Sequence, residues 1–137
     1  MSSDRLIYDV TLGSSDLQRS ATFYDAVLGA LGYKRSPETT ETWIGWGPGH
    51  DEGVSLWVTR PYDGKAPTAG NGTMVTFRAR NEAEVQAFHK AALTNGGSDE
   101  GKPGTRPHYS PTFYVAYVRD PDRNKLACVF DRHEPDE

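Results

Sequence analysis

Residues 74–97, MVTFRARNEAEVQAFHKAALTNGG, determine how this chain folds. The first five residues alternate apolar and polar side chains, which is typical of a strand with one buried face. Asn81 follows at a position suited to a helix cap, and Glu84 stands three residues later as a capping-box partner. Residues 82–94 then place apolar side chains at helical spacing, and Asn-Gly-Gly ends the helix because glycine adopts left-handed backbone conformations at low cost. The stretch predicts a strand, a tight turn and a helix.

The same pattern occurs once more, near the start of the chain. Residues 9–32 contain an alternating segment, a capping aspartate at Asp16, a helix expected over 16–30 and a terminal glycine. Asp9 aligns with Met74 and Phe23 with Phe88, both at a separation of 65 positions and without a gap. The sequence therefore predicts one strand–helix unit used twice.

Alternation and turn residues indicate the remaining strands. In the first half strands are expected at 6–12, 33–35, 42–46 and 54–58, and in the second at 73–78, 113–119 and 126–130. Residues 98–112 hold three prolines and two glycines, so any strand there should be short. The prediction is one domain over 1–137, with βαβββ modules at about 5–60 and 73–131, a linker at 61–72 and a charged tail at 132–137.

Composition narrows the possible partners and the compartment. The chain has 137 residues, a net charge of −4 and no basic run, so neither nucleic acid nor an anionic membrane is an expected partner. Its apolar runs are too short to span a bilayer. Cys128 is the single cysteine, which excludes an internal disulfide and favours a cytoplasmic location.

Four segments together resemble a known superfamily: FYDAVLGALGY at 23–33, GNGTMVTFRA at 70–79, GKPGTRPHY at 101–109 and FYVAYVRDPDRNKLACVF at 113–130. They are similar to the vicinal oxygen chelate superfamily, which includes glyoxalase I, bleomycin-resistance proteins and extradiol dioxygenases. The resemblance implies an α+β fold in which paired βαβββ modules form a cup-shaped, barrel-like mixed sheet with helices outside. It also implies a homodimer.

The resemblance implies four metal-ligand positions, on the first and last strand of each module. In this sequence they correspond to Asp9, Met74, Ser55 (with Trp57 as the other possibility) and Ala127. Only Asp9 offers an anionic oxygen, and a divalent ion needs three or four suitable donors. We therefore expect no metal at these positions and no cofactor, although a divalent metal is the family default.

Three functions remain open on the sequence. The first is binding of a small organic molecule in the cup, and its expected contacts are Asp9, Ser55, Trp57, Met74, Arg78, His108, Tyr109 and Ala127. The second is a metal-free lyase, isomerase or dioxygenase-type enzyme with Asp9 or His108 as the catalytic base. The third is a metal enzyme with displaced ligands, for which His50, His108 and Asp9 are the candidates.

Other residues have structural interpretations. Arg78 could bind a carboxylate or phosphate of a ligand, or form a surface ion pair. His89 is expected as a hydrogen-bonded histidine at the edge of the core, and Cys128 as a small buried side chain against the second helix. Arg123 occupies a turn position where the family usually has glycine, so a positive φ is expected there.

Overall fold

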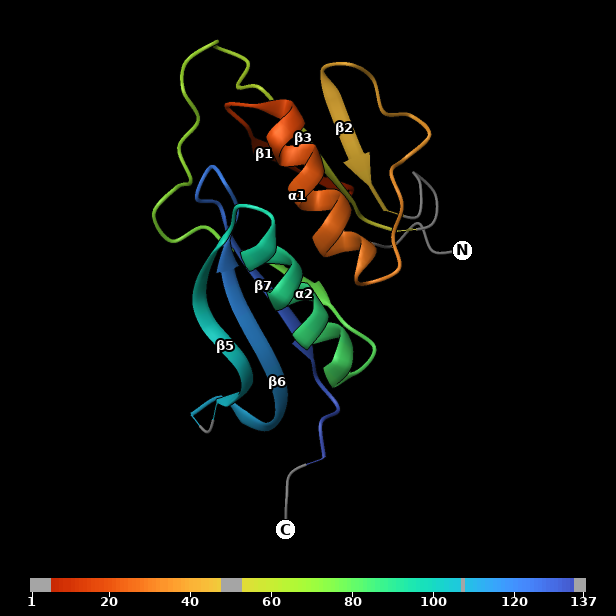
Figure 1. Cartoon of the computed structure of the whole chain (residues 1–137), viewed down its shortest axis with the longest axis vertical. Coiled ribbons are helices and arrows are strands. Elements are labelled where there is room, and N and C mark those ends of the chain that lie inside the picture. Colours follow the sequence, from red (N-terminus) through yellow and green to blue (C-terminus); the bar gives the residue numbers. More distant parts are fainter. Residues whose placement is uncertain (1–5, 48–52, 107, 135–137) are drawn as a thin grey trace.

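Two modules, each with a helix lying on a small sheet, make up the structure (Figure 1). The computed structural model describes residues 6–47, 53–106 and 108–134. Module one contains β1 (Asp9–Gly13), α1 (Leu17–Gly29), β2 (Trp43–Trp46) and β3 (Ser55–Thr59), with the strand order β1-β3-β2. Module two contains β4 (Val75–Arg78), α2 (Glu82–Thr94), β5 (Ser98–Arg106), β6 (Ser110–Arg119) and β7 (Lys125–Phe130), in the order β4-β7-β6-β5.

The first strand of each module pairs in parallel with the last strand of that module. Thr11 lies opposite Trp57 in the β1–β3 pair, and Thr76 lies opposite Ala127 in the β4–β7 pair. Because Thr11 and Thr76 are themselves 65 positions apart, the repeat in the sequence is also a repeat in strand register. The predicted α+β fold with two related modules is confirmed, as two separate mixed sheets rather than a closed barrel.

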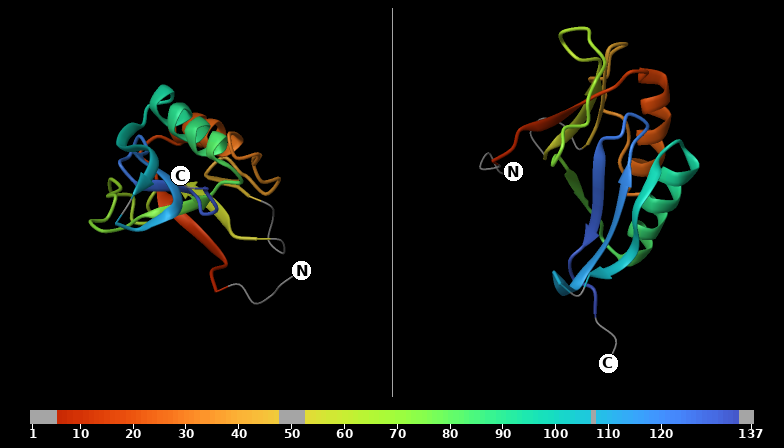
Figure 2. Two further views of the ribbon diagram at one scale, coloured as in Figure 1. Left: turned by 90° about the horizontal axis from the view of Figure 1, so that it is seen from below. Right: turned by 90° about the vertical axis from the view of Figure 1, so that its left-hand side faces the viewer.

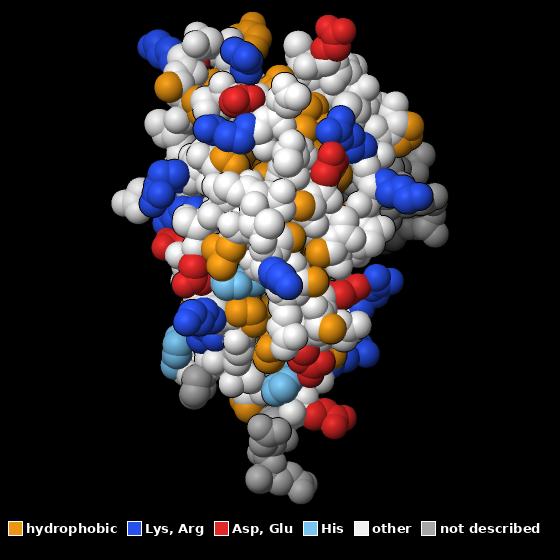
Figure 3. Space-filling model, viewed as in Figure 1, with side chains coloured by type: hydrophobic (Ala, Val, Ile, Leu, Met, Phe, Trp, Pro, Cys, Tyr) orange, Lys and Arg blue, Asp and Glu red, His pale blue; other side chains and the backbone are white. Residues whose placement is uncertain are grey.

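The helices lie on one side of the molecule and the sheets on the other (Figure 2). Alternation along the strands sends one set of side chains towards the helices, where Leu56, Val58 and Cys128 join the core. The other set points to the face without helices, which we call the open face. On the helix-bearing side, acidic and basic side chains are interspersed and no broad patch of one sign forms (Figure 3).

Both helices begin at the predicted caps. Asp16 accepts a hydrogen bond from the Arg19 amide at 3.1 Å, and Asn81 accepts one from the Glu84 amide at 2.9 Å. The Glu84 carboxylate, however, accepts from the Arg80 amide at 2.8 Å instead of closing the predicted capping box on Asn81.

A buried polar cluster joins the two modules. The Tyr24 hydroxyl on α1 donates to Asp120 at 2.6 Å, and Asn124 donates to the Gly13 carbonyl at 3.2 Å. Asp120 lies in the turn between β6 and β7, where Arg123 has the expected positive φ, at 72°. Burial is the main reason why the pKa of Asp120 lies above its ordinary value, against the lowering effect of the donors around it. These hydrogen bonds thus attach the β6–β7 turn of module two to module one, through α1 and the end of β1.

Two sequence predictions about secondary structure were wrong. Residues 33–35 form no strand and contribute one isolated bridge, between Arg35 and Trp46. Residues 98–112 contain the nine-residue β5, because an edge strand with register shifts tolerates proline and glycine. In the charged tail, His133 Nδ1 lies 2.8 Å from the Glu82 carboxylate at the start of α2.

Candidate functional site

A pocket of about 570 Å³ lies between the modules, along the free edge of β4. Module one contributes side chains from β1, α1, β2 and β3, and module two contributes the whole of β4 and Met74 before it. The lining residues are mostly apolar: Ile7, Val10, Leu28, Tyr33, Trp46, Gly47, Val54, Ser55, Leu56, Met74, Val75, Thr76, Phe77 and Arg78.

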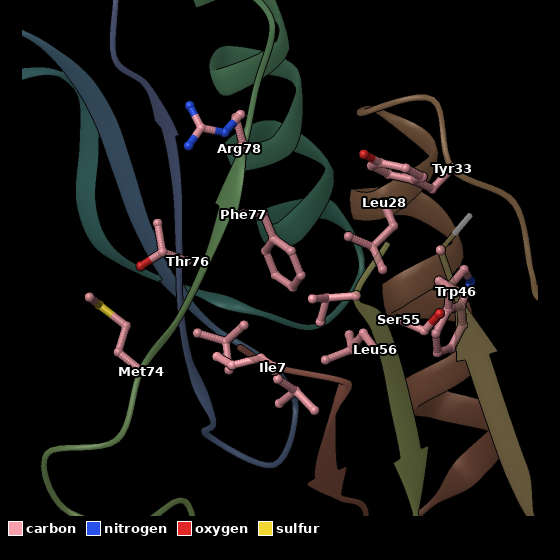
Figure 4. A pocket seen from close by; sticks show the side chains of 14 residues that line it. Ile7, Leu28, Tyr33, Trp46, Ser55, Leu56, Met74, Thr76, Phe77 and Arg78 are labelled. Carbon is pink, nitrogen blue, oxygen red and sulfur yellow. The ribbon is translucent and has the colours of Figure 1, made fainter. Parts of the chain in front are cut away.

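The β4 strand presents two chemically different sides to this pocket. Phe77 points across towards Leu28, while Thr76 and Arg78 project from the other side of the strand (Figure 4). Phe77 is held in place by the Phe88 ring of α2, with ring centroids 5.9 Å apart. The pocket thus combines an apolar wall fixed by the core with polar groups at its opening.

Trp46 forms a buried part of the module-one wall. Its side chain is almost fully buried, and its indole Nε1 donates to the Asp25 carboxylate at 2.9 Å. Burial alone would raise the pKa of Asp25, but hydrogen bonds from Arg35 and Trp46 outweigh it and hold the pKa below its ordinary value. The charged Asp25 carboxylate, which accepts hydrogen bonds from both Arg35 and Trp46, therefore fixes the indole ring against the pocket.

Three of the predicted ligand contacts line this pocket: Ser55, Met74 and Arg78. Arg78 also makes the ion pair that the sequence left open, with Asp131 at 2.8 Å. Ser55 is buried, whereas Met74 and Arg78 are exposed at the opening.

The other predicted contacts lie elsewhere. Trp57 is on the open face, but its ring lies across Gly45 of the neighbouring strand and does not reach the pocket. Asp9 is exposed beside Ser55, and Ala127 is buried in the middle of β7. His108 and Tyr109 are exposed at the β5–β6 turn and contact each other, with ring centroids 4.5 Å apart.

The side chains at the four family metal positions are poor ligands for a divalent ion. Strand register makes Trp57 the counterpart of Ala127, because each lies opposite one of the two equivalent threonines. Neither an indole nor a methyl side chain is a metal ligand, so either assignment leaves Asp9 as the one anionic donor. Among the described residues, no three His, Cys, Asp or Glu side chains come together as a metal-binding group. His50 lies outside the described residues.

Sequence reasoning missed most of the pocket wall. Ile7, Val54 and Phe77 carry no chemical signature, and their shared pocket depends on how the two modules meet. Trp46 was recognisable as an aromatic in a short strand, but only the tertiary structure shows that it lines the pocket between the modules.

Comparison with known proteins agrees with the duplicated architecture. A family model described as the glyoxalase/bleomycin resistance protein/dioxygenase superfamily matches residues 7–128. The chain belongs to this family.

Solved structures of family members superpose over almost the whole chain. A glyoxalase/bleomycin resistance protein from Albidiferax ferrireducens is 33% identical, with 92% of this chain and 98% of that chain covered and a TM-score of 0.80. A lactoylglutathione lyase from Agrobacterium tumefaciens is 17% identical, with coverage of 96% and 97% and a TM-score of 0.63, and shows the fold alone. No curated protein is significantly similar in sequence.

Proposed function

We propose that this glyoxalase-family chain binds a small organic molecule in the pocket between its modules, without a metal at the family positions. The observation that carries the proposal is the pocket of about 570 Å³ lined from both modules. Its volume lies within the range of small-molecule sites, and its apolar wall with a few polar groups has their usual composition.

The chemistry of the lining defines what would fit. Leu28, Trp46 and Phe77 would bury an apolar or aromatic body, and burial of that surface would supply most of the affinity. Polar groups on the lining are available to orient it: Tyr33, Ser55, Thr76 and Arg78. The residues at the family metal positions are poor ligands for a divalent ion, so the proposal favours binding over metal-assisted catalysis.

The test is retention of a ligand by purified protein, with a variant that fills the pocket from its rim. Val54 lines the pocket and is 42% exposed, so Val54→Trp should occupy the space without disturbing the core. Mass spectrometry of denatured wild-type protein should release a small molecule that Val54→Trp has lost and the control Val54→Ala retains. The proposal fails if wild type and Val54→Trp carry the same molecules and bind anilinonaphthalene sulfonate equally.

We further propose that the chain is a homodimer, because the fold leaves large apolar side chains exposed, among them Trp43 and Phe113. We also propose a cytoplasmic location, which the single buried cysteine, Cys128, supports. No helix in the described part of the chain is long and apolar enough to cross a membrane. Light scattering at micromolar concentration tests the dimer, and a monomer mass would contradict it.

A further inference from the structure

A second, polar pocket of about 430 Å³ adjoins the first at Met74, which lines both. Its other lining residues are the glycine-containing segment 69–73 and two cationic side chains, Arg119 at the end of β6 and Lys125 at the start of β7. No metal or ligand position implied by the family corresponds to Arg119 or Lys125. The pocket therefore needs its own explanation.

The two cations are placed directly opposite each other. Arg119 and Lys125 are cross-strand partners in the antiparallel β6–β7 pair, so their side chains share the open face. Like charges in such positions destabilise a sheet. Glu100 compensates part of this charge, with its carboxylate 2.9 Å from Arg119 Nε.

Lys125 has no carboxylate partner among the described residues. Its ammonium lies 5.4 Å from the centre of the Tyr117 ring, which the Arg106 guanidinium also approaches, at 5.6 Å. This part of the open face thus carries three cations and one paired carboxylate. The unbalanced positive charge favours an anion as the occupant.

The loop over residues 69–73, which lines the pocket, contains backbone amides that the described part of the fold does not use. Gly70 and Gly72 have φ of 75° and 96°, and the turn they form is closed by a 3.2 Å hydrogen bond from the Thr73 amide to the Gly70 carbonyl. The amides of Asn71 and Gly72 have no acceptor within the described parts of the chain. Turn amides of this kind commonly bind anionic oxygens.

We propose that Lys125, Arg119 and the loop 70–73 bind the carboxylate or phosphate group of the molecule whose apolar body occupies the pocket between the modules. The ligand is then an amphipathic organic anion that extends past Met74, from the apolar pocket into the polar one. This inference rests on the proposed function for the apolar half of the ligand, whereas the anion site can be tested by itself.

The experiment compares octanoate, octyl phosphate and uncharged octanol by calorimetry, with inorganic phosphate followed by amide chemical shifts. Wild-type protein should bind one of the two anions about three- to tenfold more tightly than octanol, the range expected for partly exposed charged contacts. The preferred anion identifies carboxylate or phosphate as the recognised group. Inorganic phosphate should shift the amide signals of Asn71 and Gly72.

Lys125→Gln should abolish the preference for the anion and leave octanol binding unchanged. Lys102→Gln, with the same loss of charge on an exposed residue outside both pockets, is the matched control. Lys125→Arg should restore the preference, and equal melting temperatures should exclude a folding defect.

Each other outcome separates the two hypotheses. Equal binding of octanol and both anions would overturn the anion site and leave the proposed function standing. A preference lost in Arg78→Gln but kept in Lys125→Gln would also overturn it, by placing the anion at the pocket opening. If inorganic phosphate shifts the amide signals of Asn71 and Gly72 but no octyl compound binds, the result would support the anion site and count against the apolar pocket.

Discussion

Replacing Gly45 with alanine tests how tightly the open face of module one is packed. An added Cβ would lie 2.5 Å from Cζ3 and 2.6 Å from Cε3 of the Trp57 ring, far inside contact distance. The backbone cannot move away easily, because Ser36 donates to the Gly45 carbonyl at 2.7 Å and Thr39 donates its hydroxyl to that carbonyl and accepts from the Gly45 amide. The Trp57 ring, 8% exposed, must therefore be displaced.

Overpacking of this kind typically costs about 1–3 kcal/mol, and a domain of this size loses roughly 3–5 °C in Tm for each kcal/mol. Gly45→Ala should therefore melt about 3–15 °C below wild type, measured by circular dichroism, with a matching decrease in the urea midpoint. Gly29→Ala is the matched control, because no described atom outside its own helix backbone lies within 4 Å of the added Cβ at the end of α1. Alanine there should leave stability unchanged or raise it by up to about 1 kcal/mol.

A second substitution identifies the cause. Trp57→Phe provides space for the new methyl group, so the double variant should lose less stability than the sum of the two single changes. Additive losses, or a Gly45→Ala protein as stable as Gly29→Ala, would refute the proposed contact between this glycine and the indole ring.

Two further predictions concern buried hydrogen bonds and pH. Asp120→Asn places an amide NH₂ against hydrogen-bond donors such as the Tyr24 hydroxyl. The free energy of unfolding in urea should therefore fall by about 1–3 kcal/mol. An unchanged value would mean that this cluster does not couple the modules. Asp25→Asn keeps an acceptor for Trp46 but removes the charge paired with Arg35, a half-exposed interaction worth about 0.5 kcal/mol after solvent screening. Because the pKa of Asp25 is lowered in the folded state, the wild-type advantage should be complete above the ordinary aspartate pKa and vanish as the pH falls through the lowered value. A difference between the two proteins that stays constant down to pH 2 would contradict it.

The repeat and its local signals were readable from the sequence because they depend on neighbours along the chain. Alternation distinguishes the helix-facing side of a strand from the open side, and the predicted buried position of Cys128 is confirmed. The helix caps at Asp16 and Asn81 likewise depend on residues three positions away. Residue type alone was enough to show that the family positions carry poor metal ligands.

The tertiary structure decided what lies between the modules. Trp46 and Phe77 belong to different halves of the chain, and the same pocket contains both only because the two modules pack together. The pairing of Arg119 with Lys125 depends on the β6–β7 register, and the docking of Asp120 onto Tyr24 depends on the packing of one module against the other. Local sequence patterns specify the secondary structure and buried face of each segment. Contacts between side chains distant in sequence depend instead on how the modules and strands pack against one another.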